Sequence, residues 1–217
     1  MYFTKSNWYS ELSFNENFKS ISQFYPEKTI ISTGLSKWCG AGGWRLGYFI
    51  IPETLKQLRD SLKILASETF TSVSAPIQYA AIAAYNNNHD EYINNSRSIL
   101  KSVGEYVYEN LKSNKININK PQGGFYLMPE FLIDKFSNSE EMCSNILKET
   151  GVALLPGSDF GFSKERLIVR LSFTDFNGQE FMKNLKGTKK LDSNAISEFA
   201  PKIVEGTKRL KDWVESN

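Results

Sequence analysis

This sequence contains few cysteines and histidines, and its net charge is small. Its 217 residues include two cysteines, Cys39 and Cys143, and one histidine, His89, which sits in a polar turn and is not expected to be catalytic. Two cysteines are too few for a disulfide framework, and no charged-then-apolar leader opens the chain. A reducing, cytoplasmic location is therefore expected, and no metal site is predicted.

The charge balance and the short apolar runs exclude two classes of partner. The formal net charge is +2, from 26 basic and 24 acidic side chains, which is too small to indicate a nucleic acid or an anionic membrane as partner. The longest weakly polar run, residues 75–85, is about half the roughly 20 residues that a membrane helix needs. With 41% apolar residues the chain can bury a sizeable core, so a small molecule is the expected partner.

Glycine, in contrast, is dense in residues 33–48, where five of the sixteen positions are glycine. Glycine allows positive φ angles and close backbone approach, so a tight, shaped loop is expected here. The β-branched run 29–32 precedes the loop and the apolar run 46–51 follows it. Both runs are predicted to be strands.

Lys37 and Arg45 give this loop a specific chemistry. Lys37 follows the end of a strand and is flanked by Trp38, and loss of water there would make its amine a usable nucleophile. A planar guanidinium at Arg45 with a hydroxyl at Ser36 can bind a phosphate through charge-assisted hydrogen bonds. An imine-forming lysine beside a phosphate site suggests pyridoxal phosphate. The alternative is a surface lysine and arginine around a glycine turn.

The same residues resemble a known signature. Ser36-Lys37, then seven residues ending in Gly43-Trp44, then Arg45-Leu46-Gly47-Tyr48, closely resemble the cofactor-lysine motif of class I/II aminotransferases, which are pyridoxal-phosphate enzymes of fold type I. The resemblance implies that Lys37 forms the Schiff base with the cofactor. It also implies that Arg45 and Ser36 bind the cofactor phosphate.

A second motif matches only in part. The stretch from Tyr9 to Phe14 is similar to the segment that begins at the tyrosine of the family's Asp-x-x-Tyr, so Tyr9 would donate a hydrogen bond to the cofactor's phenolate oxygen; otherwise it is a core tyrosine. The position of the aspartate, which pairs with the pyridine nitrogen, falls on Ser6. A serine hydroxyl cannot stabilise a pyridinium charge as a carboxylate does, so catalysis would be weakened.

Three further motifs follow in the family's order. Residues 121–126 resemble its Pro-x-Gly-Gly-x-Tyr strand entry, and residues 152–161 its strand and turn near the substrate. Residues 166–173 resemble the strand whose final arginine, followed by Leu-Ser, binds the substrate's α-carboxylate, which implies this role for Arg170. The alternative for Arg170 is a structural salt bridge, because a buried guanidinium needs an anion. Arg166 is expected to be a surface charge.

Periodicity and capping residues predict the remaining elements. An amphipathic helix should open at Pro52 with Leu55, Leu58, Leu62 and Leu65 on one apolar face. A small-residue helix over 75–85 is expected in the core, and residues 1–15 are expected to form a loop. The other predicted helices are 16–24, 91–114, 139–149 and 194–214, the last broken or restarted at Pro201, and the other predicted strands are 116–118, 125–128, 152–155 and 167–173.

Together these matches imply an α/β fold. Residues 1–104 would be the C-terminal part of the large cofactor-binding domain of fold type I, and residues 105–217 the smaller α+β C-terminal domain. The family's upstream half is missing from the sequence. A truncated chain, a fragmentary gene and a genuine short protein all fit this pattern.

The activity implied is pyridoxal-phosphate-dependent transfer of an amino group between an amino acid and a 2-oxo acid, by a protein that is a homodimer when complete. Two other functions stay open. One is another fold-type-I reaction, such as that of a carbon-sulfur lyase or a cyclopropane-forming synthase. The other is a non-catalytic aminotransferase-like module.

Overall fold

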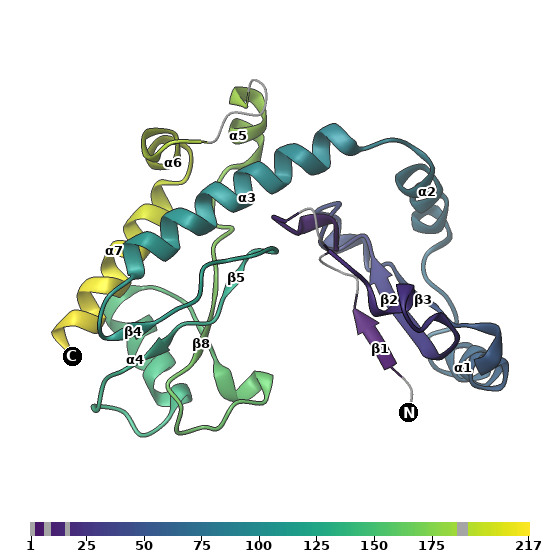
Figure 1. Ribbon diagram of the computed structural model, residues 1–217, viewed down its shortest axis with the longest axis horizontal. Helices are drawn as coiled ribbons and strands as arrows, with labels where there is room; N and C mark the ends of the chain where they lie inside the picture. The colour runs from purple at the N-terminus through teal and green to yellow at the C-terminus, as the bar shows by residue number, and fades with distance from the viewer. Residues whose placement is uncertain (1–2, 7–9, 16–17, 186–190) are drawn as a thin grey trace. The chain divides into compact units, whose positions relative to one another are not determined.

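The computed structural model describes residues 3–6, 10–15, 18–185 and 191–217. The chain divides into two compact units, which we call unit 1 (Met1–Ile93) and unit 2 (Asn94–Asn217). The boundary expected near Gly104 and the observed division both lie within helix α3 (Asp90–Leu111). Both units mix helices with strands, in line with the α/β prediction (Figure 1).

Unit 1 is built around a small sheet with the strand order β1-β2-β3. Its elements are β1 (Phe3–Ser6), η1 (Ser10–Leu12), η2 (Ile21–Gln23), η3 (Pro26–Lys28), β2 (Thr29–Gly34), η4 (Gly42–Trp44), β3 (Gly47–Ile50), η5 (Glu53–Leu55), α1 (Lys56–Thr69), α2 (Ala75–Asn86) and the start of α3. Strands β2 and β3 are antiparallel and confirm the two strands predicted on either side of the glycine-dense loop.

Two predictions for the start of the chain are wrong. Strand β1 lies where a loop was expected, and it pairs in parallel with β2, with Ser6 opposite Ser32. The helix predicted over 16–24 is reduced, within its described residues 18–24, to the single 3₁₀ turn η2. The hydroxyl of Ser20 accepts a hydrogen bond from the Ser22 amide, and such side-chain bonds compete with a continuing helix.

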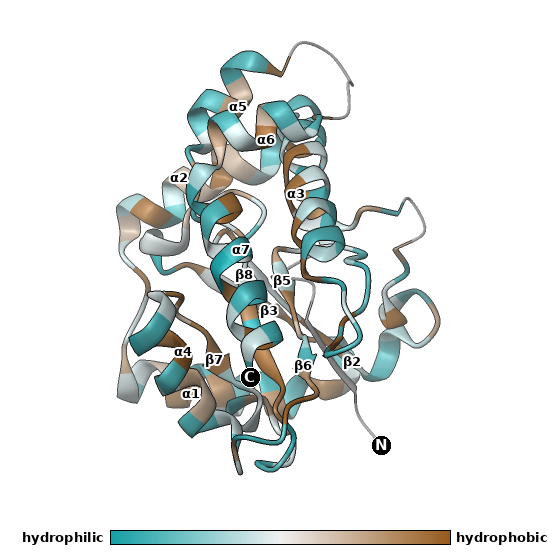
Figure 2. Ribbon diagram, turned by 90° about the vertical axis from the view of Figure 1, so that its left-hand side faces the viewer, coloured by the Kyte–Doolittle hydropathy of each residue, from teal (hydrophilic) through white to brown (hydrophobic). Residues whose placement is uncertain are grey.

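Helices α1 and α2 form as predicted, but they do not lie in a core. No residue of α1 is buried, and Leu65 on its expected apolar face is 57% exposed. In α2 only Ala81 is buried, while Tyr79 is 75% exposed. Figure 2 shows hydrophobic residues interspersed with hydrophilic ones along α1 and α2. The periodicity therefore predicted the helices correctly, whereas the expectation that α2 belongs to the core is wrong for the described structure.

Unit 2 has the larger core. From Asn94 onward it contains the rest of α3, then β4 (Ile116–Asn117), β5 (Tyr126–Leu127), β6 (Glu130–Phe131), α4 (Ser139–Thr150), β7 (Leu155–Pro156), η6 (Gly157–Phe160), β8 (Val169–Ser172), α5 (Gly178–Asn184), α6 (Ser193–Phe199) and α7 (Pro201–Ser216). Val103 of α3, Met142 of α4, Phe173 and Phe181 are fully buried. The C-terminal helix does start afresh at Pro201, as the sequence allowed.

Two small antiparallel sheets shape unit 2, one of β4 and β6 and one in the order β5-β8-β7. Strand β8 is central in the second sheet, with Tyr126 opposite Ser172 and Leu155 opposite Arg170. Helix α3 packs closely against the residue after β8, because a Cβ atom at Gly104 would lie 2.9 Å from Cζ of Phe173. Glycine is therefore favoured where this helix meets the sheet.

The described residues contain no helix that is both long and apolar enough to cross a membrane. They also contain no group of three or more histidine, cysteine, aspartate or glutamate side chains arranged to hold a metal ion.

Candidate functional site

The loop between β2 and β3 is fixed by buried residues on either side of Lys37. Leu35 is completely buried, and Trp38 and Leu46 are almost so. The Leu35 amide donates to the Leu46 carbonyl at 3.3 Å, and the Ala41 amide donates to the Leu35 carbonyl at 3.2 Å. Ser36 and Lys37 are half-buried between these anchors. The apolar neighbours thus hold the Ser36-Lys37 pair at the surface of a rigid turn.

Glycine gives this loop its tight path. Gly40 has φ +65°, and its amide closes a turn onto the Lys37 carbonyl at 3.3 Å. A Cβ atom at Gly40 would lie 3.5 Å from the Tyr92 hydroxyl, and one at Gly42 would lie 3.7 Å from the Ser36 carbonyl oxygen. The positive φ therefore favours glycine at position 40, whereas a Cβ atom at either position would make only an ordinary contact.

Arg45 adopts a backbone conformation that is unusual for a residue with a side chain. Its φ is 55° and its ψ is 38°, in the left-handed region. Its Nη1 donates to the Gly42 carbonyl at 2.8 Å, and the side chain is otherwise exposed. Because Gly42 also lies beside the Ser36 carbonyl, the guanidinium is folded back toward the turn that carries Ser36 and Lys37. Residues in such sparsely populated conformations cluster at ligand sites.

An aromatic cluster lies next to this turn. The Trp38 ring is 5.9 Å from that of Tyr85 and 6.0 Å from that of His89, and Tyr85 meets Tyr48 edge-on at 5.4 Å. Burial, followed by the hydrogen bond with Tyr48, raises the pKa of Tyr85 above its ordinary value. Burial likewise raises the pKa of the Cys39 thiol. These groups are therefore uncharged at neutral pH.

The cluster lines a cavity of about 450 Å³ on the face of β2 and β3 that carries Thr33 and Tyr48. Ser36, Lys37 and Arg45 are not among its lining residues. His89 is, and its Nε2 is buried without a hydrogen-bond partner among the described residues. The cavity is thus a neighbour of the lysine turn and is not the turn itself.

Strand β1 places Ser6 near the edge of the sheet from which the lysine loop leaves β2. It is the last residue of β1, and it pairs with Ser32, which lies near the end of the parallel strand β2 that leads to Lys37. Parallel strands bring their carboxyl ends to one edge of a sheet, which is where open α/β sheets bind ligands. Tyr9, the proposed phenolate ligand, lies outside the described residues.

In unit 2, Arg170 is held by aromatic rings. Its Cζ lies 4.5 Å from the centre of the Tyr126 ring and 4.3 Å from that of Phe160. The side chain is half-buried, and it makes no ion pair with any described residue. Stacked aromatic faces orient a planar guanidinium and leave its N–H edge available to an anion. The structural salt bridge considered from the sequence is therefore not found in the described part of the chain.

Arg166 behaves differently. It forms two parallel hydrogen bonds with Glu130, from Nε to Oε1 at 2.8 Å and from Nη2 to Oε2 at 2.7 Å. These bonds lower the pKa of the Glu130 carboxyl. About half of the Arg166 side chain is exposed, so Arg166 is a surface charge that is already paired with Glu130. Of the two arginines, Arg170 is the one that can bind the carboxylate of a ligand.

The two rings around Arg170 were not predicted as site residues. Tyr126 belongs to the segment 121–126 and Phe160 to the segment 152–161, both of which were noted as motifs. Their positions in those motifs could have identified both rings as candidate site residues. Only the pairing of β5, β8 and β7 shows that they meet at one arginine.

The residues present fit pyridoxal phosphate in part. A lysine amine, a serine hydroxyl and a folded-back guanidinium share one rigid loop, which suits an aldehyde joined to a phosphate. At the position expected to face the ring nitrogen, β1 carries Ser6 and no carboxylate. The residues of the loop could therefore attach the cofactor, whereas Ser6 does not supply the carboxylate that would activate the cofactor ring.

Sequence comparison identifies relatives. The profile of the family Aminotransferase class I and II matches residues 7–184. The probable N-acetyl-LL-diaminopimelate aminotransferase of Bacillus subtilis (strain 168) is 33% identical over 166 residues, covering 76% of this chain and 40% of that protein. The aspartate aminotransferase of Bacillus sp. (strain YM-2) is 34% identical over 162 residues, covering 70% of this chain and 40% of that protein. The chain thus spans less than half the length of these relatives.

Solved structures show the same relationship. The alanine aminotransferase from Pyrococcus furiosus superimposes with a TM-score of 0.77 at 25% identity, over 99% of this chain and 49% of that one. The aspartate aminotransferase from Thermotoga maritima gives a TM-score of 0.73 at 23% identity, over 99% of this chain and 48% of that one. These neighbours confirm the predicted fold-type-I architecture, of which this chain spans about half. The chain belongs to the class I and II aminotransferase family.

Proposed function

We propose that this chain is part of a pyridoxal-phosphate-dependent transaminase that moves an amino group between an amino acid and a 2-oxo acid. The observation that carries the proposal is the loop between β2 and β3. There Arg45, in a left-handed conformation, is tied back to Gly42 beside the Ser36-Lys37 turn. Membership of the aminotransferase family supports it.

Each polar residue of the loop has a role in this proposal. The cofactor, when bound, supplies an aldehyde for the amino group and a ring that withdraws electrons. Lys37 Nζ would hold the aldehyde and, once released by a substrate amine, would remove the proton from the substrate α-carbon. Arg45 and Ser36 Oγ would bind the phosphate, and Tyr9 would donate to the phenolate oxygen.

Arg170 would bind the α-carboxylate of the substrate. Its guanidinium is oriented by Tyr126 and Phe160 and has no carboxylate partner among the described residues. A planar guanidinium can donate two parallel hydrogen bonds to a carboxylate, whereas a lysine amine acts as a point charge. We further propose that the complete protein is a cytoplasmic homodimer in which residues 1–104 and 105–217 belong to the large and small domains.

Trapping tests the role of Lys37. The chain is incubated with pyridoxal phosphate and reduced with borohydride, and the peptides are mapped by mass spectrometry. A reduced adduct on Lys37 is expected, and Lys37→Arg should abolish it. Lys56→Arg, on the exposed start of α1, is the matched control and should leave it unchanged. An adduct spread equally over several lysines would refute the assignment.

Substitution of Arg170 tests the carboxylate site. Arg170→Lys should weaken the binding of an amino acid or 2-oxo acid by about tenfold or more, since a lysine amine cannot donate the two parallel hydrogen bonds of a guanidinium. Arg166→Lys is the matched control, because Arg166 already pairs with Glu130. Equal effects of the two substitutions would contradict the role of Arg170.

A non-catalytic module is the second candidate function, and Ser6 favours it. Without a carboxylate at the ring nitrogen, a bound cofactor would be a poor electron sink. Such a module would still show the absorbance of lysine-bound pyridoxal phosphate but would release no 2-oxo acid from any amino acid in a panel. Release of a 2-oxo acid would exclude it, and product analysis would separate transamination from carbon-sulfur cleavage or ring closure.

A further inference from the structure

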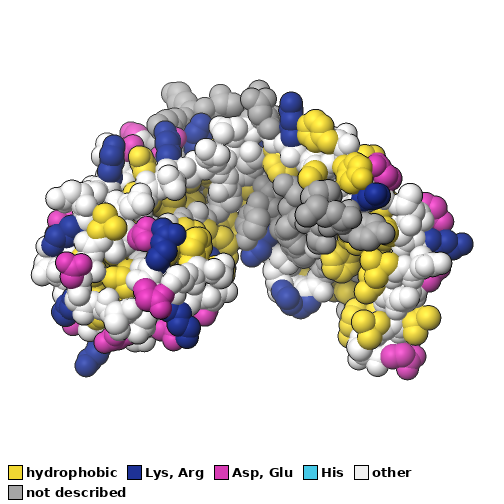
Figure 3. Space-filling view, turned by 60° about the horizontal axis from the view of Figure 1, so that its bottom comes forward, with side chains coloured by type: hydrophobic (Ala, Val, Ile, Leu, Met, Phe, Trp, Pro, Cys, Tyr) yellow, Lys and Arg dark blue, Asp and Glu magenta, His cyan; other side chains and the backbone are white. Residues whose placement is uncertain are grey.

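The cavity beside the lysine turn combines aromatic walls with polar groups. Figure 3 shows hydrophobic side chains gathered on the surface of unit 1, so exposed apolar groups alone do not mark a site there. The cavity of about 450 Å³ differs because its aromatic rings surround an imidazole and carboxylates. All of its lining residues belong to unit 1. Its volume lies within the range of about 300–1,000 Å³ that is usual for small-molecule pockets.

We propose that this cavity binds the protonated amino group of a small organic amine. Ser36, Lys37 and Arg45 do not line it, so it is separate from the loop that is proposed to hold the cofactor. The proposal therefore goes beyond the transaminase activity and does not depend on it.

Three inclined rings form the apolar walls. The ring planes of Trp38 and Tyr85 meet at 58° and those of Tyr85 and Tyr48 at 81°, so the three rings do not form a flat stack. The Trp38 indole donates a hydrogen bond to the Tyr85 hydroxyl, which also bonds with Tyr48, and these bonds hold the rings in place. Inclined aromatic faces attract a cation from more than one side, and such cages bind organic ammonium groups.

His89 supplies an unsatisfied polar atom next to these rings. Its ring lies 6.0 Å from that of Trp38, and its Nε2 is buried without a hydrogen-bond partner among the described residues. Buried polar atoms usually have a partner, and a ligand group that enters the cavity would provide one. An imidazole nitrogen without a proton accepts a hydrogen bond, and the N–H groups of an ammonium ion donate. An amine that carries N–H groups therefore fits better than a quaternary one.

The charges of the cavity wall also favour a cation. Glu11 and Asp90 line the cavity, and its described lining residues include neither lysine nor arginine. Asp90 accepts a hydrogen bond from Asn88 Nδ2 at 3.0 Å and makes no ion pair with any described residue. A ligand with a carboxylate would meet these negative charges without a cation to balance it. The expected ligand is therefore a simple amine and not an amino acid.

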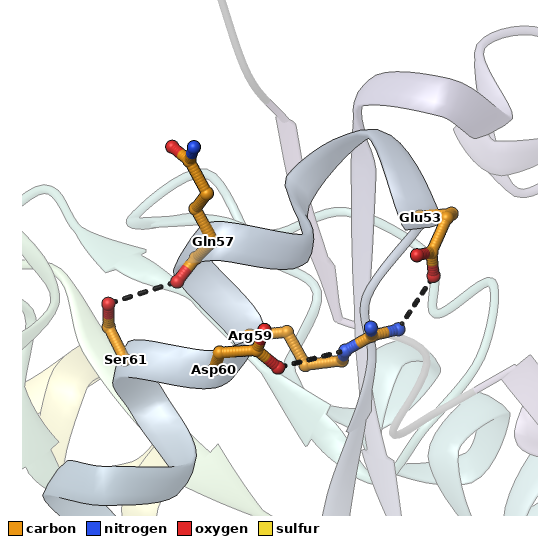
Figure 4. A network of polar contacts seen from close by, with 5 residues as sticks. All are labelled: Glu53, Gln57, Arg59, Asp60 and Ser61. Atoms are coloured by element: carbon orange, nitrogen blue, oxygen red, sulfur yellow. Dashed lines mark hydrogen bonds and ion pairs between the residues drawn. The ribbon is translucent and has the colours of Figure 1, made fainter.

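The carboxylates of Glu53 and Asp60, also in unit 1, show the contrasting case. Arg59 binds Glu53 at 2.9 Å and lies 3.7 Å from Asp60 (Figure 4). Asp60 thus already has a cation beside it, and it does not line the cavity. It provides a matched control for Asp90.

Three ligands with one carbon ring test the charge preference. Cyclohexylammonium, cyclohexanol and cyclohexanecarboxylate are similar in size and differ in charge. NMR titration of the 217-residue chain should show saturable binding of the ammonium ion, tighter by about tenfold or more than binding of the other two. The titration contains no cofactor, so its result is independent of whether the complete protein is a transaminase. Equal binding of the three, tighter binding of the carboxylate, or no saturable binding of the ammonium ion would overturn the proposal.

Ring variants connect the binding to the cavity. Tyr85→Leu removes one aromatic face and should weaken the binding of cyclohexylammonium by about tenfold, whereas Tyr85→Phe keeps the face and should retain most of the affinity. Tyr79→Leu is the control, because Tyr79 is 75% exposed on the same helix, α2, and does not line the cavity. An equal loss in Tyr85→Leu and Tyr79→Leu would contradict binding in the cavity.

A charge variant keeps the test decisive if Tyr85→Leu disturbs α2. Asp90→Asn should weaken the binding of cyclohexylammonium by about threefold or more, because it removes a negative charge from the cavity wall. Asp60→Asn removes the same charge elsewhere in unit 1 and should leave the affinity unchanged. If Asp90→Asn has no effect, or if both variants weaken binding equally, the ammonium ion does not bind in this cavity.

Discussion

Replacing Gly104 by alanine should show how tightly α3 packs against the end of β8. A Cβ atom at this position would lie 2.9 Å from Cζ and 3.1 Å from Cε2 of Phe173, and 3.2 Å from Cγ of Pro121. Phe173 is completely buried, so its ring has no free space to enter. Overpacking of this kind costs about 1–3 kcal/mol. Alanine also favours a helix over glycine by about 1 kcal/mol, so the net loss should be about 1 kcal/mol.

Gly206→Ala provides the matched control. Gly206 lies in the interior of α7, and a Cβ atom there would meet only Cγ2 of Val152 at 3.8 Å, an ordinary contact. The helix-propensity gain is common to both substitutions, so the difference in free energy of unfolding between the two variants equals the overpacking cost, about 1–3 kcal/mol.

Urea denaturation followed by pulse hydrogen exchange measures both variants. The peptides that cover residues 99–111 report on the core of unit 2, into which α3 packs. Gly104→Ala should lower the midpoint and Gly206→Ala should raise it. Shifts of the same sign and size would refute the close contact between α3 and Phe173.

Three further perturbations have defined outcomes. Thr71, whose φ of 64° is unfavourable for a β-branched residue, closes α1, so Thr71→Gly should stabilise that helix by about 1 kcal/mol, seen as slower hydrogen exchange of α1; no change would contradict strain at this position. The bonds from Arg166 lower the pKa of Glu130, so their stabilisation is complete above the unfolded-state pKa, ordinarily about 4.5, and is lost as pH falls through the folded-state pKa. Glu130→Gln should therefore flatten the acid limb of stability against pH, and an unchanged limb would show that other carboxylates dominate it. Burial raises the pKa of Cys143 to about 11, so its alkylation by iodoacetamide near pH 8 should be at least about tenfold slower in the native chain than in urea, as measured by mass spectrometry.

Local patterns predicted most elements because their information lies within a few residues. The leucine spacing after Pro52 predicted α1, and Pro201 marked the start of α7. The glycines of residues 33–48 predicted a shaped loop, and Gly40 does adopt a positive φ. Arg45 in the same loop also has a positive φ, and the residue type arginine gives no indication of it.

Features that depend on distant segments were beyond local patterns. Strand β1 is a strand because it pairs with β2, which begins some twenty residues later along the chain. The leucine spacing predicted one apolar face on α1, but amphipathicity shows only that a face needs cover and does not show what covers it. The aromatic setting of Arg170 likewise requires three strands to pair.

For the candidate site, the signature located Ser36, Lys37 and Arg45 in one loop, and the structure shows how that loop is held. It did not indicate the bond from Arg45 to Gly42, which depends on a backbone angle. The roles of Lys37, Arg45, Ser36, Tyr9 and Arg170 remain predictions for the experiments above.

The uneven burial of the two units also has a consequence for the life of the chain in a cell. Chaperones and proteases act on exposed apolar surface and on transiently open segments, and the abundance of a protein follows how long such surface persists. A chain in which unit 1 leaves large hydrophobic side chains such as Phe49, Leu65 and Tyr79 exposed offers such surface to both. Its lifetime in a cell should therefore depend on how far these side chains of unit 1 are covered.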